Sequence, residues 1–498
     1  MNVNPITRLD YPDLDVIRVE DTYYMVSTTM HFMPGCEILQ SFDLVHWEHV
    51  TYVYETLDHT DAQQLKSGQN IYGQGMWAAS LRYHEGRFYI CFVANDTRKT
   101  YLYTSEKIDG PWKKQLIEGF YHDGSLLFDE DGRNYIVYGN DEIWITELNE
   151  DLTAPKKDGL HRLLVSDHKN PKLGYEGSHI QKINGYYYIF LIHSLRDRWM
   201  RTEACFYSDS LEGEFTGGDV LCDDRGYCGQ GVAQGGIVDT PDGKWYAMLF
   251  QDSGAVGRLP ILLPVTWKDH FPVFGQNGHV PEEIEVHSTR PGYIYQPLVG
   301  SDDFCNGLLP RWQFNHDPDP RYYHLDALQG TYTITTREVC TELTQAVNTL
   351  TQRMSYPSCA AEVTVDASAL KEGDVAGLCA FQGCYAAVGI TKHHGKYEVL
   401  MLDKKEDGIL DMTEGTVVES HQMDFRLEAD FCNMKDEARC YYRVNKGDWL
   451  PIGTVHKLYF KLDHFTGCRF GLFCYAAEET GGSACFRDFK YYDVDEIS

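Results

Sequence analysis

Residues 174–193, GYEGSHIQKINGYYYIFLIH, contain the pattern that decides the fold. The Asn-Gly pair at 184–185 is a strong hairpin signal, because a type I′ turn needs positive φ at both central residues. The run at 186–192 is too short and too aromatic for an ordinary helix, and such residues favour strands. The stretch therefore predicts a β-hairpin that carries Glu176 at the start of its first strand.

The same layout recurs through the first 300 residues as an apolar segment, a polar or glycine-containing turn and an aromatic strand. It occurs at 15–28, 80–93, 126–139, 179–192 and 236–250. Roughly fifty residues per copy, each with two to four short strands, is the period of a propeller blade. The five copies predict a five-bladed β-propeller. The alternative is a sandwich with accidental repetition, which the shared turn-then-aromatic layout disfavours.

The pattern changes around 291–304, where two prolines bracket a predicted linker. Beyond it, alternating strand-like segments are separated by His-Gly, Lys-Gly and Thr-Gly turns, which is typical of a β-sandwich. We therefore predict an all-β protein with two domains, a five-bladed β-propeller at 1–297 and a C-terminal β-sandwich at 298–498.

The composition restricts the partners. The net charge of −30 disfavours nucleic acid and anionic membranes. The first ten residues lack the basic and apolar regions of a signal peptide, and no run of 18 apolar residues exists. The 15 cysteines form no CxxC pair, which favours buried, reduced thiols. Together these features predict a cytoplasmic protein with a small-molecule partner, and they leave a homo-oligomer open.

Acidic residues precede the aromatic strands of three repeats at corresponding places. They are Asp13 or Asp15 in the first repeat, Asp123 in the third and Glu176 in the fourth. A propeller gathers its inner strands around one axis, so these carboxylates are expected to converge. Converging carboxylates suit glycoside hydrolysis, in which one protonated carboxyl donates to the leaving oxygen and an ionised one activates water or attacks. A third can tune the acid by its charge.

In combination the motifs resemble glycoside hydrolase family 43. The first half carries NPITRLDYPDLDVIRVEDTYYMVST, GMWAASLRYHEGRFYI, DGSLLFDEDGRNYIVYG, YEGSHIQKINGYYYIF and QGGIVDTPDGKWYAMLF. The second half is similar to the family's C-terminal β-sandwich, a concanavalin A-like jelly roll, through DDF at 302–304, QFNHDPD at 313–319, NTLTQR at 348–353 and GDVAGL at 373–378. The resemblance implies a five-bladed propeller that acts as a β-xylosidase, an α-L-arabinofuranosidase or an arabinanase.

The resemblance also implies roles for the three acids. The general base falls on Asp13 rather than Asp15, although Leu14 follows it where the family often has proline. The pKa modulator falls on Asp123 and the general acid on Glu176. Because the family inverts configuration, Asp13 would activate a water and Glu176 would protonate the glycosidic oxygen. Asp123 would keep Glu176 protonated and oriented.

Other residues are predicted to line the sugar pocket. Arg258 resembles the family's substrate-contacting arginine, and a guanidinium can bind sugar hydroxyls. Trp77 and Phe32 are candidates to stack on the sugar, with core packing as the alternative for Phe32. Phe465 is a candidate to reach the pocket from the second domain.

Many members of the family hold a calcium ion near a histidine at the propeller centre. The aligned position here is Gln234, whose amide oxygen can face a hydrated Ca²⁺. Calcium in a structural or electrostatic role is therefore the one cofactor that the resemblance implies.

The sequence thus predicts an inverting exo-glycosidase that releases terminal α-L-arabinofuranosyl residues from arabinoxylan-derived oligosaccharides. The alternative is a β-D-xylosidase or a bifunctional enzyme, because the two pentoses present similar hydroxyls. The preference rests on DYPDLDV and HFMPG, which depart from the PDPS and WFPG patterns of xylosidases. A phosphorylase would need a phosphate-binding cluster beyond Arg258 and Arg201. A non-catalytic sugar-binding propeller is disfavoured because all three acids are present.

Overall fold

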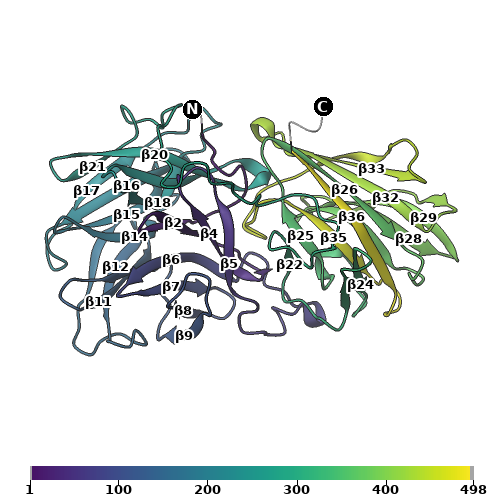
Figure 1. Ribbon diagram of the computed structural model, residues 1–498, viewed down its shortest axis with the longest axis horizontal. Coiled ribbons are helices and arrows are strands. Elements are labelled where there is room, and N and C mark those ends of the chain that lie inside the picture. The colour runs from purple at the N-terminus through teal and green to yellow at the C-terminus, as the bar shows by residue number, and fades with distance from the viewer. Residues whose placement is uncertain (1–2, 494–498) are drawn as a thin grey trace.

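The computed structural model describes residues 3–493 and consists of two all-β domains (Figure 1). The described residues contain no α-helix, only the short 3-10 helices η1 (Lys66–Gly68), η2 (Gly254–Val256), η3 (Leu343–Gln345) and η4 (Cys432–Met434). Within 3–493 no helix has the length and apolarity that crossing a membrane requires. The predicted fold class, a five-bladed propeller followed by a sandwich, is confirmed.

Five four-stranded antiparallel sheets form the propeller. Blade I contains β1 (Asp15–Val19), β2 (Thr22–Val26), β4 (Gly35–Ser41) and β5 (Glu48–Tyr54). Blade II contains β6 (Met76–His84), β7 (Arg87–Ala94), β8 (Lys99–Ser105) and β9 (Lys113–Ile117). Blade III contains β10 (Ser125–Phe128), β11 (Asn134–Asn140), β12 (Glu142–Leu148) and β13 (His161–Ser166). Blade IV contains β14 (Glu176–Ile183), β15 (Tyr186–Ser194), β16 (Arg201–Ser208) and β17 (Thr216–Leu221). Blade V contains β18 (Val232–Asp239), β19 (Trp245–Asp252), β20 (Arg258–Lys268) and β21 (Phe271–Phe274).

The predicted hairpin is the β14–β15 pair of blade IV. Asn184 and Gly185 have φ of 50° and 85°, as a type I′ turn requires. Successive residues of β15 face opposite neighbours, because side chains alternate along a strand. Ile189 packs with blade III and Phe190 with blade V. Burial on both faces explains why this strand is apolar without alternation.

The sandwich packs a nine-stranded sheet against a seven-stranded one. The first sheet contains β22 (Gln313–Asn315), β25 (Leu350–Arg353), β35 (Arg469–Tyr475), β27 (Val375–Phe381), β28 (Ala386–His393), β29 (Lys396–Lys404), β30 (Leu410–Met412) and β31 (Thr416–Val418), together with β3 (Phe32–Met33) of the first domain. The second contains β23 (Tyr323–Asp326), β24 (Thr331–Thr335), β36 (Ser483–Asp493), β26 (Ser358–Asp366), β32 (Gln422–Asp430), β33 (Glu437–Val444) and β34 (Leu450–Lys457).

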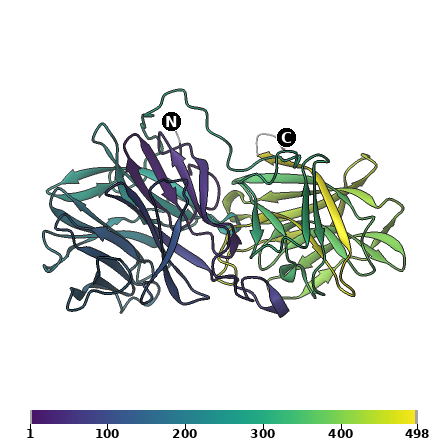
Figure 2. The same cartoon turned by 60° about the horizontal axis from the view of Figure 1, so that its bottom comes forward.

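An irregular segment joins the two domains. The last propeller strand ends at Phe274 and the first sandwich strand begins at Gln313, so the predicted boundary at 297/298 lies within this connection. Figure 2 shows the chain passing from the propeller to the sandwich as a loop. The domains also share a sheet, because β3 leaves blade I and pairs with β22.

A buried ion pair joins the domains at their centre. Arg353 on β25 donates from Nη1 to Glu37 Oε2 on β4 at 2.8 Å, and the side chains are only 5% and 3% exposed. The Arg353 Nε also donates to the Asp10 carbonyl at 2.9 Å, and the guanidinium covers the ring of Tyr11. Burial alone would raise the pKa of Glu37, but Arg353 and His49 lower it to about 2.

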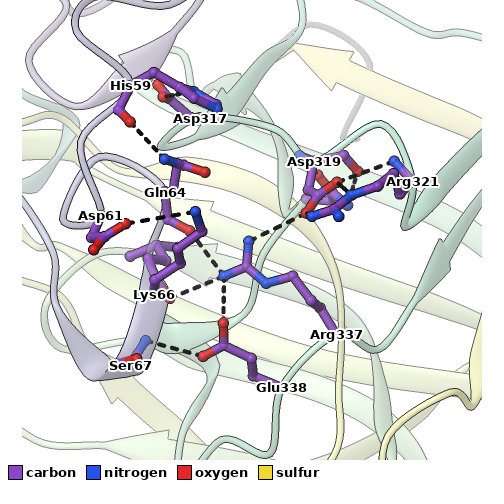
Figure 3. A network of polar contacts seen from close by, with 12 residues as sticks. His59, Asp61, Gln64, Lys66, Ser67, Asp317, Asp319, Arg321, Arg337 and Glu338 are labelled. Carbon is purple, nitrogen blue, oxygen red and sulfur yellow. Dashed lines mark hydrogen bonds and ion pairs between the residues drawn. The ribbon is translucent and has the colours of Figure 1, made fainter.

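A second polar network lies at the edge of the interface, where residues 59–67 of the propeller meet the sandwich (Figure 3). Arg337 donates to the carbonyls of Gln64 and Leu65 at 2.9 and 3.1 Å. His59 contacts Asp317 at 2.7 Å. These contacts satisfy the backbone carbonyls of a loop that has little secondary structure of its own.

We expect Arg353→Met to lower the free energy of unfolding by about 3–5 kcal/mol, because it leaves the Glu37 carboxylate buried without its main partner. Urea unfolding at pH 7 measures the change. Arg321→Met is the matched control, because Arg321 also pairs with a carboxylate, Asp319, but its side chain is 73% exposed. We expect this substitution to lower the free energy of unfolding by less than about 1 kcal/mol. Equal effects of the two substitutions would show that the central pair does not hold the domains.

Candidate active site

The inner strands of the five blades close a ring around the propeller axis. β1, β6, β10, β14 and β18 each contact the next, and β18 contacts β1. Each strand starts beside a residue with left-handed backbone: Asp13 (φ 50°), Ala78 (36°), Asp123 (48°), Gly177 (63°) and Gln234 (64°). In blades II, IV and V the strand pairing slips at this place, which is a β-bulge. Bulges re-aim side chains, and here they do so at one end of the axis.

The ring explains how the predicted acids meet. Asp13 and Asp123 occupy the left-handed position of their blades, whereas Glu176 occupies the position just before it. The sequence suggested that the three acids occupy equivalent positions in their blades, but Glu176 lies one residue earlier than the position that Asp13 and Asp123 occupy. The shift turns the Glu176 side chain toward Asp123, and Gly177 provides the left-handed residue in its place. Gly177 N donates to Asp123 Oδ2 at 2.9 Å.

Each carboxylate has a distinct set of partners. Asp13 accepts from Arg258 Nη1 at 2.8 Å and from Thr28 Oγ1 at 2.7 Å. Glu176 Oε2 accepts from Asn140 Nδ2 at 2.6 Å. The ion pair with Arg258 suits Asp13 to a role that needs an ionised carboxylate. The hydrogen-bond donor to Glu176 is a neutral amide rather than a guanidinium.

His122 lies between two of the acids. Its Nε2 is 3.6 Å from Asp123 Oδ2 and 3.5 Å from Glu176 Oε2. The negative charge of Asp123 raises the pKa of His122 to about 9, against the effect of burial and with help from Glu176 and Asp13. Burial raises the pKa of Asp123 to about 6, because repulsion from Glu176 and Asp13 adds to burial while His122 opposes it.

Three of the four predicted pocket-lining residues gather beside the acids. The Trp77 ring lies 5.6 Å from the Phe465 ring and 6.2 Å from the His122 ring. Arg258 is buried beneath Phe465, with its guanidinium carbon 4.3 Å from the ring centre. Phe465 comes from the sandwich, so the second domain supplies part of the pocket wall.

The structure places Phe32 elsewhere. It lies on β3, which pairs with β22 of the sandwich, and its side chain is 1% exposed. Its ring is covered by the guanidinium of Arg469, whose central carbon is 3.5 Å from the ring centre. A side chain with no free face cannot stack on a sugar, so Phe32 serves the domain interface, the core-packing alternative for this residue.

Gln234 lies at the propeller centre, as its position in the fifth repeat predicts, but the surroundings do not fit a hydrated Ca²⁺. The central cavity is about 10 Å³, room for about one water. The nearby carboxylate of Asp15 is already bound by Arg82 at 2.7 Å and by His179 at 3.1 Å. Burial would raise the pKa of Asp15, yet Arg82 and His179 lower it to about 2. Calcium takes six to eight oxygen ligands, and Arg82 here supplies the positive charge instead.

The only other cluster of metal-binding types in residues 3–493 is His122, Asp123 and Glu176, whose ligand atoms lie within 4.8 Å of one another. The carboxylate atoms that would bind a metal are already engaged, because Asp123 Oδ2 accepts from Gly177 N at 2.9 Å and Glu176 Oε2 from Asn140 Nδ2 at 2.6 Å. We therefore assign no metal to this cluster.

Sequence reasoning missed two residues of the site, His122 and Asn140. His122 stands directly before Asp123 in YHDGS. When the repeats are aligned on their left-handed residues, His122 in blade III takes the position that Glu176 has in blade IV. Asn140 ends β11, and its contact with Glu176 joins two blades. No local pattern marks Asn140, because only the packing of blade III on blade IV brings it to the acid.

A five-bladed propeller with three carboxylates at one end of its axis, under an aromatic wall, defines a glycoside hydrolase. The comparisons with known proteins agree. The model of glycosyl hydrolases family 43 matches residues 3–272, and the model of the beta xylosidase C-terminal concanavalin A-like domain matches residues 301–492. The chain therefore belongs to glycoside hydrolase family 43.

Relatives resemble the chain over its whole length. A β-xylosidase of Formosa agariphila is 27% identical over 99% of this chain and 89% of its own. The structure of a bifunctional GH43-CE protein of Bacteroides eggerthii is 42% identical with a TM-score of 0.93, and the chain spans 64% of that longer protein. An engineered GH43 enzyme described as having both endo-xylanase and exo-arabinofuranosidase activity is 27% identical over 99% of both chains, with a TM-score of 0.86.

We expect Asp123→Asn to stabilise the protein at pH 7 by up to about 3 kcal/mol. A carboxyl whose pKa rises from 3.8 to about 6 on folding opposes folding once it ionises, at about 1.4 kcal/mol per unit. Urea unfolding should show the gain at pH 7 and its loss as the pH falls through 6 toward 4. Asp21→Asn, at an exposed carboxylate paired with Arg290, is the control and should not stabilise. A destabilised Asp123→Asn protein at pH 7 would contradict the burial argument.

Proposed function

We propose that this protein is an inverting exo-glycosidase that releases terminal α-L-arabinofuranosyl residues from short arabinoxylan-derived oligosaccharides. The observation that carries the proposal is the convergence of Asp13, Asp123 and Glu176 at one end of the propeller axis, where Phe465 of the sandwich covers the Arg258 that pairs with Asp13. The carboxylates provide the acid and the base that hydrolysis needs. The aromatic wall from the second domain narrows the space beside them, which suits the end of a chain better than its middle.

The proposed reaction uses each acid once. Glu176 donates its proton to the glycosidic oxygen, and the rest of the oligosaccharide leaves with a free hydroxyl group. Asp13, paired with Arg258, takes a proton from a water that attacks the anomeric carbon from the opposite face. The product is a free pentose of inverted configuration. Asp123 contributes negative charge that disfavours early ionisation of Glu176.

The pocket walls suit a small neutral sugar. Trp77 and Phe465 present half-buried aromatic faces, and such faces pack against the apolar side of a sugar ring. Arg258 is itself buried, with Nη1 on Asp13 and Nη2 directed at the Phe465 carbonyl, so it supports the pocket through Asp13 and Phe465.

The second candidate is a β-D-xylosidase, or one enzyme with both activities. It is favoured by the Formosa agariphila relative, which is named a β-xylosidase and matches almost the whole chain. Initial rates on 4-nitrophenyl α-L-arabinofuranoside and 4-nitrophenyl β-D-xylopyranoside decide between the candidates. Hydrolysis of neither substrate would contradict both, and a sugar-binding protein would then remain.

We expect Asp13→Asn and Glu176→Gln to lower kcat/KM on the preferred oligosaccharide by a factor on the order of 10²–10⁴, the usual contribution of general acid–base groups. On an aryl glycoside Glu176→Gln should lose less than Asp13→Asn, because nitrophenolate leaves with little protonic help. Asp239→Asn, at the end of the inner strand β18 that lies away from the acids, is the control and should keep full activity. Full activity in either active-site variant would refute the assigned roles.

We expect Phe465→Ala to lower kcat/KM by about 3–10-fold, as the loss of one aromatic contact of about 0.5–1.5 kcal/mol predicts. Steady-state kinetics on the preferred aryl pentoside measure the effect. Phe460→Ala is the matched comparison, because its ring lies 5.6 Å from Phe465 but farther from Arg258. If Phe465→Ala left kcat/KM unchanged, the sandwich would not form part of the sugar site.

A further inference from the structure

We propose that His122 is a positioning residue whose positive charge holds Glu176 and Asp123 together and sets the upper pH limit of catalysis. The inference rests on the proposed function, because it assigns the limit to loss of the Glu176 proton. His122 neither donates nor accepts a proton in the proposed reaction.

The blade geometry directs His122 into the site. Trp77, His122 and Glu176 each stand directly before the left-handed residue of their blades. The fold therefore presents the three side chains at corresponding places in blades II, III and IV. Trp77 and His122 are 6.2 Å apart between ring centres, and His122 and Glu176 are 3.5 Å apart between polar atoms. The position in blade IV carries the carboxyl of Glu176, and the neighbouring position in blade III carries the imidazole of His122, which can be protonated.

The contacts of His122 are ionic in character. Its Nε2 is enclosed and makes no hydrogen bond of good geometry, yet it lies within 3.6 Å of two carboxylates. A neutral imidazole would gain little there, whereas an imidazolium is attracted by both. The side chain is 20% exposed, so exchange of its proton with water is possible.

The charged groups around His122 come from four blades. Asp123 is on its own segment, Glu176 comes from blade IV, and Asp13 comes from blade I paired with Arg258 of blade V. The neighbours from blade II and the sandwich, Trp77 and Phe465, carry no charge. Three carboxylates, those of Asp13, Asp123 and Glu176, thus lie near two basic groups, Arg258 and His122. The charge of Asp13 is neutralised by Arg258, which leaves His122 to face the other two carboxylates.

The remaining balance concerns Asp123 and Glu176. Their mutual repulsion favours keeping a proton on one of them, which a general acid needs. The charge of His122 works in the opposite direction, because an opposite charge within about 4–6 Å favours the ionised carboxylate. Its pKa, raised to about 9, keeps that charge present through neutral pH. The charge of His122 therefore opposes the effect of the Asp123 charge on the Glu176 carboxyl, and its removal is expected to extend catalysis to higher pH.

The first test is the pH dependence of kcat/KM for the full chain on the preferred oligosaccharide, whose leaving alcohol needs a proton from the general acid. We expect His122→Phe and His122→Gln to move the midpoint of the alkaline limb upward by roughly one pH unit. Glutamine keeps a donor without the charge, so similar shifts in both variants identify charge as the cause. His46→Gln, on a side chain that is 63% exposed, is the control and should leave the limb in place. An unchanged or lowered limb in both His122 variants overturns the inference.

The second test does not depend on activity. We expect the His122 resonance, assigned by its absence from His122→Gln, to titrate well above the ordinary histidine range of about 6.5 in NMR spectra of histidine-labelled protein. In Asp123→Asn it should titrate at a lower pH. A titration at or below about 6.5 in the wild type overturns the inference whether or not the protein hydrolyses pentosides. Absence of hydrolysis together with the raised titration would instead contradict the proposed function.

Discussion

Arg353 of the sandwich and Glu37 of the propeller form an ion pair that is almost completely removed from water. A buried charge that loses its partner is costly, so the domains cannot turn against each other while this pair remains. The same contact fixes the segment around Asp10, whose carboxylate accepts from the backbone N–H groups of Arg258 and Gly467, each at 2.7 Å. Asp10 therefore positions the arginine that holds the base and the loop that carries the aromatic wall. The pocket depends on the domain interface.

Within the propeller, a repeated backbone feature places the chemistry. A left-handed residue at the start of each inner strand turns the chain at the axis, and the residue on it or just before it faces the site. Aspartate tolerates this conformation better than most residues, which suits Asp13 and Asp123 to it. In blade IV glycine takes the turn and the preceding glutamate takes the chemical role. Four of the five copies of this unit thus supply three carboxylates, an imidazole and the ring of Trp77 to one end of the axis.

Much of the fold could be predicted from the sequence, because its signals are local. The Asn-Gly turn with its aromatic strand specifies a hairpin, and the repetition of that hairpin specifies the propeller. Asp13, Asp123 and Glu176 lie in those repeats, so their convergence follows from the blade count. Phe32 and Asn140 show where this reasoning ends. Phe32 resembles a pocket aromatic in sequence, but β3 leaves its blade to join the sandwich, and the contact of Asn140 with Glu176 crosses between blades.

The sequence by itself determined the class of fold and placed candidate acids at corresponding points of three repeats, because periodicity, turn residues and motifs act over short stretches of chain. Only the tertiary structure decided the one-residue offset of Glu176, the place of His122 between two carboxylates, and the ion pair of Arg82 with Asp15 at the propeller centre. These features depend on distances between residues that are far apart in the chain. Electrostatic interactions are set by such distances and by burial, neither of which can be read from residue order.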